Sequence, residues 1–243
     1  MRLTRVHVPG PLAAGSRQTI EGEAANHITR VLRLRPGDPL ILFDGRGGEH
    51  AARIEGLRKN AVIVAVAAHE PTDRESPLSL TLAQGLSRGE RMDWVVQKAA
   101  ELGVTRIIPV LTERTVVKLD ARQAQRRLSH WRGIAVAACE QSGRNRIPDI
   151  GAPLDLRAFL RDADTDATRL LLCPTAAQRI DSLTPPGRQV IVLIGPEGGL
   201  TDPEQRAASA AGFLAVKLGP RVLRTETAAV AALTLLQHEF GDL

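Results

Sequence analysis

A glycine-rich segment with one acidic residue follows a short apolar run in the last third of the chain, Ile194-Gly195-Pro196-Glu197-Gly198-Gly199-Leu200. Glycines let the backbone approach a bound molecule closely. A glutamate buried in such a loop would need a polar partner. The segment lacks the G-x-G-x-x-G pattern of dinucleotide-binding loops and the Gly-Lys-Ser/Thr end of a P-loop. The alternative without a ligand is a tight strand-to-helix turn, with Thr201 as the helix cap and Glu204 at the capping-box position.

A second segment combines two arginines with a glutamate, Leu218-Gly219-Pro220-Arg221-Val222-Leu223-Arg224-Thr225-Glu226-Thr227. An arginine in such a loop could stabilise negative charge that develops on a substrate, and a carboxylate could accept a proton. Surface ion pairing is the alternative explanation for the arginines. A third segment, Leu172-Cys173-Pro174-Thr175, also follows an apolar run but has little specificity of its own.

The elements that must position these segments alternate between strands and helices from residue 78 onward. Alternation and apolar runs predict strands at residues 78–83, 106–111, 170–173, 190–194 and 214–218. Helical spacing predicts helices at residues 90–102 and around 131–138, with a further helix from about Thr225. This order indicates an α/β domain with a parallel sheet covered on both faces. Ligands bind beyond the carboxyl ends of such strands, so we expect the three segments to meet there.

The N-terminal part has a different rhythm. Short β signals at residues 40–43, 49–55 and 61–66 surround one helical stretch at 24–32, which predicts a small β-barrel with one helix. A polar stretch with a proline at each end, residues 71–77, is typical of a linker. We therefore predict domains at residues 1–70 and 78–243, an α+β chain overall. The stretch 228–233 is apolar on every side, so either the domain encloses it or a second subunit covers one face.

Composition excludes several classes of protein. The 243 residues are 43% hydrophobic and 24% charged, which is ordinary for a soluble globular protein. No apolar run approaches the ~20 residues of a membrane span, and the N-terminus has no secretory pattern. Two separated cysteines, Cys139 and Cys173, make neither a metal site nor a disulfide framework. These features favour a cytoplasmic protein with no metal and no membrane partner.

The charge balance is compatible with nucleic acid. The net charge is +5, and arginine dominates the 32 basic residues. The planar guanidinium suits bidentate contacts to phosphates and bases. Genomic base composition is the alternative explanation, because it also enriches arginine.

Together these segments resemble the ribosomal RNA small subunit methyltransferase E family of SPOUT-class RNA methyltransferases. The two signatures above are the strongest points of similarity. Further blocks are Arg88-Gly89-Glu90, Glu101-Leu102-Gly103-Val104, Glu140-Gln141-Ser142-Gly143-Arg144, Pro36-Gly37-Asp38 and Asn26-His27-Ile28-Thr29-Arg30-Val31-Leu32-Arg33. The resemblance implies methylation of N3 of a uridine in the decoding region of bacterial 16S rRNA, with S-adenosylmethionine (SAM). It also implies a PUA-like β-barrel, a SPOUT domain with a C-terminal trefoil knot, a homodimer, and the small ribosomal subunit as partner.

The resemblance implies that the cofactor lies in a pocket made by residues 172–175, 194–199 and 218–225, and we assign candidate roles to individual residues on that basis. The catalytic candidates are Glu197, Arg221, Arg224 and Glu226. The cofactor-binding candidates are Leu172, Cys173, Pro174, Ile194, Gly195, Pro196, Glu197, Gly198, Gly199, Leu218, Gly219, Arg221, Leu223, Arg224 and Thr225. The candidate RNA contacts are Arg5, Arg30, Arg33, Arg35 and Arg88.

Three other functions stay open at this point. A related SPOUT enzyme would methylate another RNA position, in transfer RNA or on a ribose 2′-oxygen. A ribosome-assembly factor would keep the fold and bind RNA without turnover. A nucleotide-binding enzyme would use residues 195–199 to hold a phosphate at a helix start.

Overall fold

The computed structural model describes residues 3–116, 119–183 and 187–243. The chain divides into two compact units. The first unit comprises Met1–Glu75 and Cys139–Ile147, and the second comprises Ser76–Ala138 and Pro148–Leu243. Among the helices in the described ranges, none combines the length and apolar character that crossing a membrane requires.

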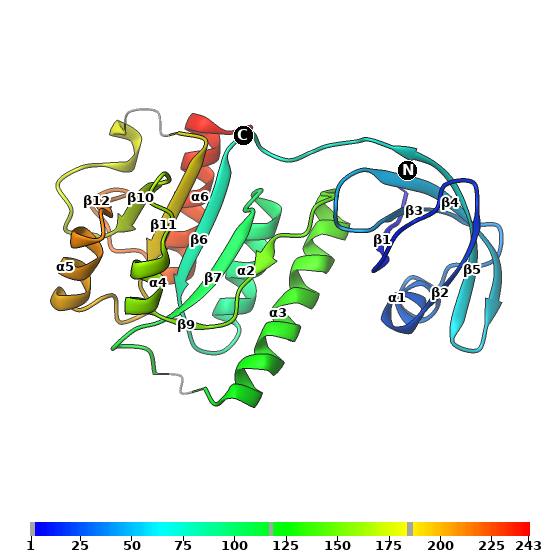
Figure 1. The fold of residues 1–243 in the computed structure, drawn as a ribbon, viewed down its shortest axis with the longest axis horizontal. Coiled ribbons are helices and arrows are strands. Elements are labelled where there is room, and N and C mark those ends of the chain that lie inside the picture. Colours follow the sequence, from blue (N-terminus) through cyan, green and yellow to red (C-terminus); the bar gives the residue numbers. More distant parts are fainter. Residues whose placement is uncertain (1–2, 117–118, 184–186) are drawn as a thin grey trace. The chain divides into compact units, whose positions relative to one another are not determined.

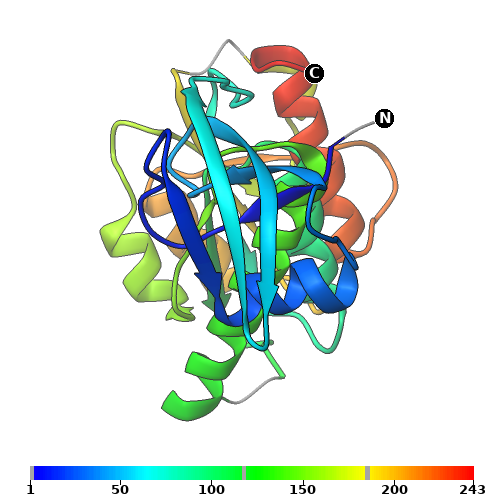
Figure 2. The same ribbon diagram turned by 90° about the vertical axis from the view of Figure 1, so that its right-hand side faces the viewer.

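The first unit is built on a curled five-stranded sheet (Figure 2). The strand order is β1 (Arg5–His7), β3 (Pro39–Phe43), β4 (Glu49–Arg58), β5 (Ala61–Glu70), β2 (Arg17–Glu21). Neighbours are antiparallel except β1 and β3, which are parallel. Alternate residues of the strands face a core that includes Leu40, Leu42, Ile54, Val62 and Val64. The predicted β-rich unit is confirmed; β1 and β2 are its edges, and no pairing between them is found in the described residues, so the barrel is open.

The single helical stretch of this unit has two parts. A short helix α1 (Gly22–Asn26) continues into a π-helical turn η1 (His27–Val31). Ile28 is fully buried in the sheet core, while Val31 is 67% exposed. Arg33, just after the turn, adopts φ +53°, a left-handed conformation that is uncommon for residues other than glycine.

A buried network of charges ties residues 139–147 to this sheet. Glu49 accepts hydrogen bonds from Arg5 (2.6 Å), Arg74 (3.1 Å) and Asn145 Nδ2 (3.1 Å). Arg144 pairs with Glu75 nearby. Burial raises the pKa of Glu49, but the three donors outweigh it and lower the pKa to about 2. Arg144 and Asn145 therefore link the 139–147 segment to Glu75 and Glu49 within the first unit.

The second unit contains a parallel sheet. Its strands run in the order β12 (Leu214–Val216), β10 (Thr168–Leu172), β11 (Gln189–Ile194), β6 (Ser79–Gly85), β7 (Arg106–Leu111), β8 (Asp149–Ile150), with β9 (Leu154–Asp155) also on β7. All these pairs are parallel, which confirms the predicted α/β class. The apolar strands alternate their side chains between two buried faces. Ile191 and Leu193, for example, belong to the core under α4 and α5.

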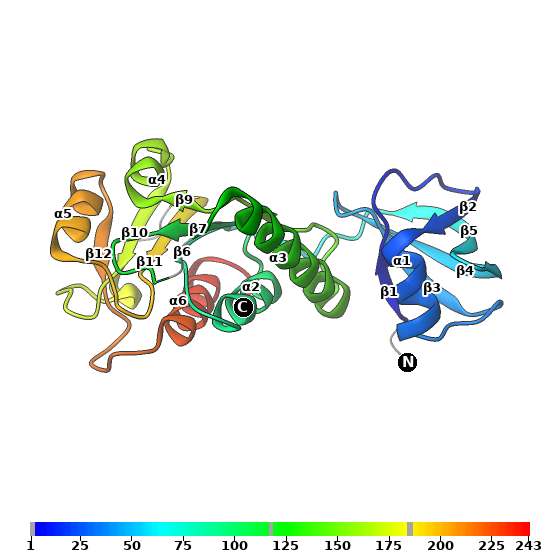
Figure 3. The same cartoon turned by 90° about the horizontal axis from the view of Figure 1, so that it is seen from below.

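Helices cover both faces of this sheet (Figures 1 and 3). On one side lie α4 (Leu156–Asp162) and α5 (Asp202–Ala210), and on the other lie α2 (Arg91–Glu101) and α6 (Thr225–Phe240). Helix α3 (Ala121–Ser142) follows β7. The apolar stretch 228–233 is not enclosed on every side, because Val230 and Ala231 of α6 are half-buried. The other alternative, a second subunit over this face, remains a prediction, as does the knot.

Candidate active site

Three loops meet beyond the carboxyl ends of β10, β11 and β12. They enclose a cavity of about 670 Å³. The strand order places these ends side by side, and β11 lies where the chain changes direction across the sheet, which is where open α/β sheets bind ligands. Every residue predicted for the cofactor lines this cavity: Leu172, Cys173, Pro174, Ile194, Gly195, Pro196, Glu197, Gly198, Gly199, Leu218, Gly219, Arg221, Leu223, Arg224 and Thr225.

Two residues at the end of β6, both missed by the sequence analysis, fix two of these loops together. The Gln84 side chain is fully buried and donates from Nε2 to Thr225 Oγ1 (2.9 Å). Thr225 Oγ1 in turn donates to the carbonyl of Gly195 (2.7 Å). A Cβ on Gly85 would lie 2.3 Å from the backbone nitrogen of Pro196, so only glycine allows this close approach. Gln84 and Gly85 thereby set where the α6 start and the 195–199 loop meet.

The exit of the glycine-rich loop is held by the predicted capping box. Thr201 Oγ1 accepts from Glu204 N, and Glu204 Oε2 accepts from Thr201 N (2.8 Å). The other Glu204 oxygen accepts from Glu113 N (2.8 Å). Arg114 Nη1 donates to the carbonyl of Gly198 (2.7 Å). The loop is thus anchored from both sides, which reduces the ordering needed when a ligand binds.

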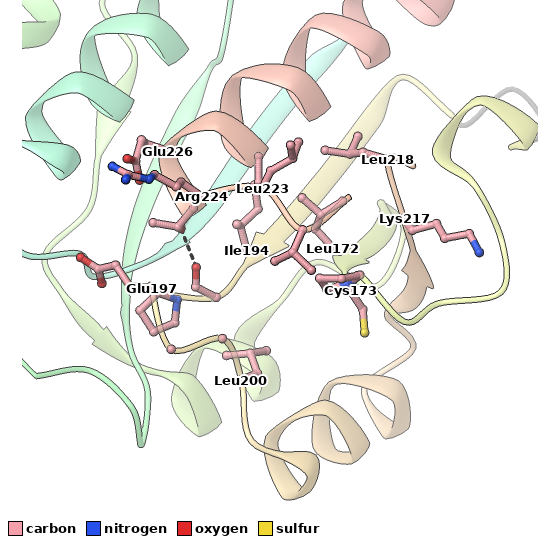
Figure 4. Close-up of a pocket in the computed structure, with 18 of the residues that line it drawn as sticks. Leu172, Cys173, Ile194, Glu197, Leu200, Lys217, Leu218, Leu223, Arg224 and Glu226 are labelled. Atoms are coloured by element: carbon pink, nitrogen blue, oxygen red, sulfur yellow. Dashed lines mark hydrogen bonds between the residues drawn. The ribbon is translucent and has the colours of Figure 1, made fainter. Parts of the chain in front are cut away.

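One wall of the cavity is apolar. Leu172, Ile194, Leu218 and Leu223 group together there, while Glu197 and Glu226 lie apart from them (Figure 4). Cys173 is buried beside this wall, with Sγ 3.2 Å from Thr175 Oγ1. An apolar slot with backbone groups at its rim suits a flat, uncharged ring.

The acidic end contains a residue that the sequence analysis missed. Arg91, the first residue of α2, lies between the two glutamates. Its Nη1 is 2.7 Å from Glu197 Oε1, and its Nε is 3.7 Å from Glu226 Oε1. Burial raises the pKa of Glu197, but hydrogen bonds from the amides of Arg88 and Glu197 and the Arg91 ion pair lower it overall. The sequence places Arg91 directly after the 88–90 block, near the start of a predicted helix. Nothing in the spacing indicates Glu197 or Glu226 as its partners.

The basic residues of the cavity are less constrained. Arg221 and Arg224 are exposed, and within the described ranges neither side chain forms an ion pair. Lys217 also lines the cavity. These three cations can meet negative charge on a ligand or substrate.

The predicted RNA contacts divide into two groups. Arg30, Arg33 and Arg35 are exposed on the first unit, and Arg88 is exposed on the second. Arg5 is only 8% exposed, and its guanidinium binds Glu49, Asn145 and the carbonyl of Arg144. The prediction for Arg5 is therefore wrong, because an arginine buried in a structural ion pair cannot reach a phosphate.

The residues of the cavity fit a nucleoside that carries a positive charge. The apolar wall accepts a ring, loop amides and carbonyls offer hydrogen bonds, and two carboxylates at the far end favour a cation. No group of three or more His, Cys, Asp or Glu side chains with metal-binding geometry occurs in residues 3–116, 119–183 and 187–243.

Comparison with known proteins agrees with this site. Residues 74–237 match the family model of an RNA methyltransferase domain, and residues 20–67 match that of an RNA methyltransferase PUA domain. The ribosomal RNA small subunit methyltransferase E of Bacillus subtilis is 33% identical, over 91% of this chain and 90% of that protein. The one from Buchnera aphidicola of Schizaphis graminum is 31% identical, over 100% of this chain and 98% of that protein.

Solved structures extend the similarity to the fold. A ribosomal RNA small subunit methyltransferase E from Neisseria gonorrhoeae, bound to SAM, is 39% identical with a TM-score of 0.93. A Legionella pneumophila structure with bound SAM is 44% identical with a TM-score of 0.95. Both alignments cover 100% of each chain. The identities, the coverage and the matched domain models show that this chain belongs to the ribosomal RNA small subunit methyltransferase E family of RNA methyltransferases.

Proposed function

We propose that the protein methylates N3 of a uridine in the decoding region of bacterial 16S rRNA, with SAM as methyl donor. The observation on which this rests is the cavity itself, in which three loops of this family's methyltransferase domain combine an apolar slot with two carboxylates. SAM-bound relatives of the same fold support the choice of cofactor.

The lining of the cavity supports the proposed cofactor-binding roles. Leu172, Ile194 and Leu223 would enclose the adenine ring, and backbone groups of Gly195, Gly198, Gly199, Leu218 and Leu223 would bind the adenosine and methionine parts. When bound, SAM supplies a methyl group on a sulfonium, which is already a strong electrophile. The chain's own task is therefore to orient the uracil and manage its proton.

The imide N3 of uridine carries a proton at neutral pH, so a base must remove it. Glu197 and Glu226 are the carboxylates that line the cavity. Arg221 and Arg224 would stabilise the negative charge that then spreads to the uracil oxygens. Glu197→Gln should lower turnover more than SAM affinity, and equal turnover would remove Glu197 from the chemistry.

N3 faces the complementary strand in a paired helix, so the target base must be unpaired or flipped out. Arg30, Arg33, Arg35 and Arg88 are exposed and are our candidates for phosphate contacts. Such contacts position the RNA, while the cavity selects the base. The 16S rRNA within a small ribosomal subunit is the proposed substrate, acted on in the cytoplasm.

A homodimer is also part of the proposal. Val230 and Ala231 leave part of α6 uncovered, Val222 is 80% exposed and Trp94 on α2 is 41% exposed. Apolar surface of this kind favours a partner. Light scattering after size exclusion should give twice the 26.2 kDa chain mass; a monomer at micromolar concentration would contradict it.

The experiment that tests the function uses small subunits and naked 16S rRNA that lack the modification. With labelled SAM, label should enter the rRNA. Binding of SAM without transfer to either substrate would favour the RNA-binding assembly factor. Competition by ATP would favour a nucleotide-binding enzyme, since the proposed site should not accept ATP.

A further inference from the structure

The cavity has two carboxylates, and the chain contacts them unequally. Arg91 lies between them, but its Nη1 forms a 2.7 Å ion pair with Glu197 and its Nε only a 3.7 Å contact with Glu226. The two glutamates come from different elements, the loop after β11 and the first turn of α6. The difference in their partners gives them different chemical capacities.

Glu197 is already saturated with donors at one oxygen. Oε1 accepts from the amide of Arg88 (2.9 Å) and from Arg91 Nη1 (2.7 Å). These bonds stabilise the charged form and lower the pKa of the carboxyl overall. A carboxylate stabilised in this way is a poor proton acceptor, because protonation would forfeit both charge-assisted bonds.

Glu226 is the opposite case. Its Oε2 has no solvent-accessible surface and no hydrogen-bond partner within the described part of the chain. Its side chain is 16% exposed, against 32% for Glu197. Leaving a buried carboxylate oxygen without a donor is unfavourable, so the Glu226 carboxylate, unlike that of Glu197, keeps acceptor capacity for a donor that arrives with the substrate.

Within residues 3–116, 119–183 and 187–243, few other charges line the cavity around Glu226. Besides Arg91 and Glu197, the charged side chains of the cavity are Lys217, Arg221 and Arg224, and Cys173 is its other titratable group. The side chain of Arg114 lies against the same loop, where it donates a hydrogen bond to the carbonyl of Gly198. Arg91 is the cation that contacts both carboxylates, so its removal leaves two negative groups close together without their shared counterion.

We propose that Arg91 is a positioning residue that fixes Glu197 as its ion-paired anchor and leaves Glu226 as the catalytic proton acceptor. This assignment rests on the function proposed above. The N3–H proton of the uracil passes to the Glu226 carboxylate, and the electron pair left on N3 by the broken N–H bond forms the new N–C bond to the methyl group. The pair of the broken S–C bond stays on sulfur, so the step needs no further reactant.

The experiment compares full-length Glu226→Gln, Glu197→Gln, Arg91→Gln and Arg91→Lys with the wild type. Lys98→Gln is the matched control, because it removes an ion-paired cation from the same helix, away from the cavity. Three quantities are measured: kcat on small subunits, the Kd for SAM by calorimetry, and the titration of Glu197 in the free protein by NMR of 13C-labelled glutamate. The resonance missing in Glu197→Gln assigns the signal.

Glu226→Gln should lower kcat by about 100-fold or more, the range of a lost general base, with the Kd for SAM changed less than about 3-fold. Arg91→Gln and Glu197→Gln should lower kcat by about 10-fold, and Arg91→Lys should recover most of that loss, since neither residue takes up the proton itself. The Glu197 midpoint should rise in Arg91→Gln and stay unchanged in Lys98→Gln.

Two results would overturn the assignment. One is a Glu226→Gln enzyme with near wild-type kcat. The other is a Glu197 titration midpoint that is the same in Arg91→Gln as in the wild type. A wild-type protein that binds SAM but yields no methylated uridine would instead reject the proposed function. The NMR titration does not depend on turnover, so the two failures are distinguishable.

Discussion

Glu49 is the buried anion of the first unit, and Glu49→Gln is the substitution that tests its role. Glu49 accepts hydrogen bonds from Arg5, Arg74 and Asn145. Arg5 belongs to β1, Arg74 lies near the end of the Met1–Glu75 segment, and Asn145 lies in the 139–147 segment. Glutamine keeps the shape and one acceptor oxygen but removes the charge. Arg5 then stays buried without its counterion, which is the costly way to break such a pair.

The size of the effect follows from the lowered pKa. A shift from the ordinary 4.5 to about 2 corresponds to about 3 kcal/mol of folding free energy at pH 7, at about 1.4 kcal/mol per pKa unit. Because the folded-state pKa is depressed, this stabilisation is present above pH 4.5 and is lost as the pH falls toward 2. By the same linkage relation, about half of it remains at pH 3.

The assay must report on the first unit. Both tryptophans, Trp94 and Trp131, lie in the second unit and the chain has no tyrosine, so intrinsic fluorescence would miss the relevant transition. Urea unfolding followed by far-UV circular dichroism at pH 7, 5 and 3 is suitable. Glu55→Gln is the control, because Glu55 lies on the same strand but pairs with Arg17, whose side chain is 72% exposed.

The expected result is a loss of about 3 kcal/mol in Glu49→Gln at pH 7 that shrinks at pH 3, against at most about 1 kcal/mol in Glu55→Gln. A loss below about 1 kcal/mol, or one that does not depend on pH, would show that the desolvation of Glu49 and Arg5 offsets their ion pair, and that the pair does not stabilise the first unit.

Three further predictions concern the site and the RNA. Gly85→Ala should weaken SAM binding by at least about 10-fold in calorimetry, because the new Cβ would lie 2.3 Å from Pro196 N and the loop must move; Gly133→Ala, with nothing within 4 Å, should not. Thr225→Val should lower the unfolding free energy by about 1–3 kcal/mol, because Gln84 and the Gly195 carbonyl lose their shared partner; an unchanged denaturation midpoint would contradict this. RNA affinity should fall steeply with salt, and Arg30→Gln or Arg33→Gln should each reduce the log–log slope by about 1; a flat salt response would exclude these contacts.

The sequence predicted the parallel sheet and the residues around the cavity well, for a physical reason. Strand runs such as 107–111 and 190–194 are continuous apolar segments, and parallel strands bring their carboxyl ends to one edge. Loops that leave neighbouring strands must then meet. The capping box at Thr201 was likewise local and therefore readable from spacing alone.

The rest of the site depends on contacts that spacing cannot reveal. Arg91 pairs with residues more than 100 positions away, and Gln84 pairs with Thr225 across 141 positions. The prediction that Arg5 contacts RNA failed because no local pattern in the sequence distinguishes an arginine in a buried ion pair from an exposed one. The same holds for residues 139–147, whose membership of the first unit arises from Glu49 and Glu75.

Identification of the methylated nucleoside is the direct test of the proposed reaction. Small subunits lacking the modification would be incubated with the protein and isotope-labelled SAM, and the 16S rRNA would be digested for mass spectrometry. We expect label in 3-methyluridine, and in one oligonucleotide from the decoding region. Label in another nucleoside, or in a ribose-methylated one, would contradict the proposed specificity, and no label with SAM bound would contradict catalysis itself.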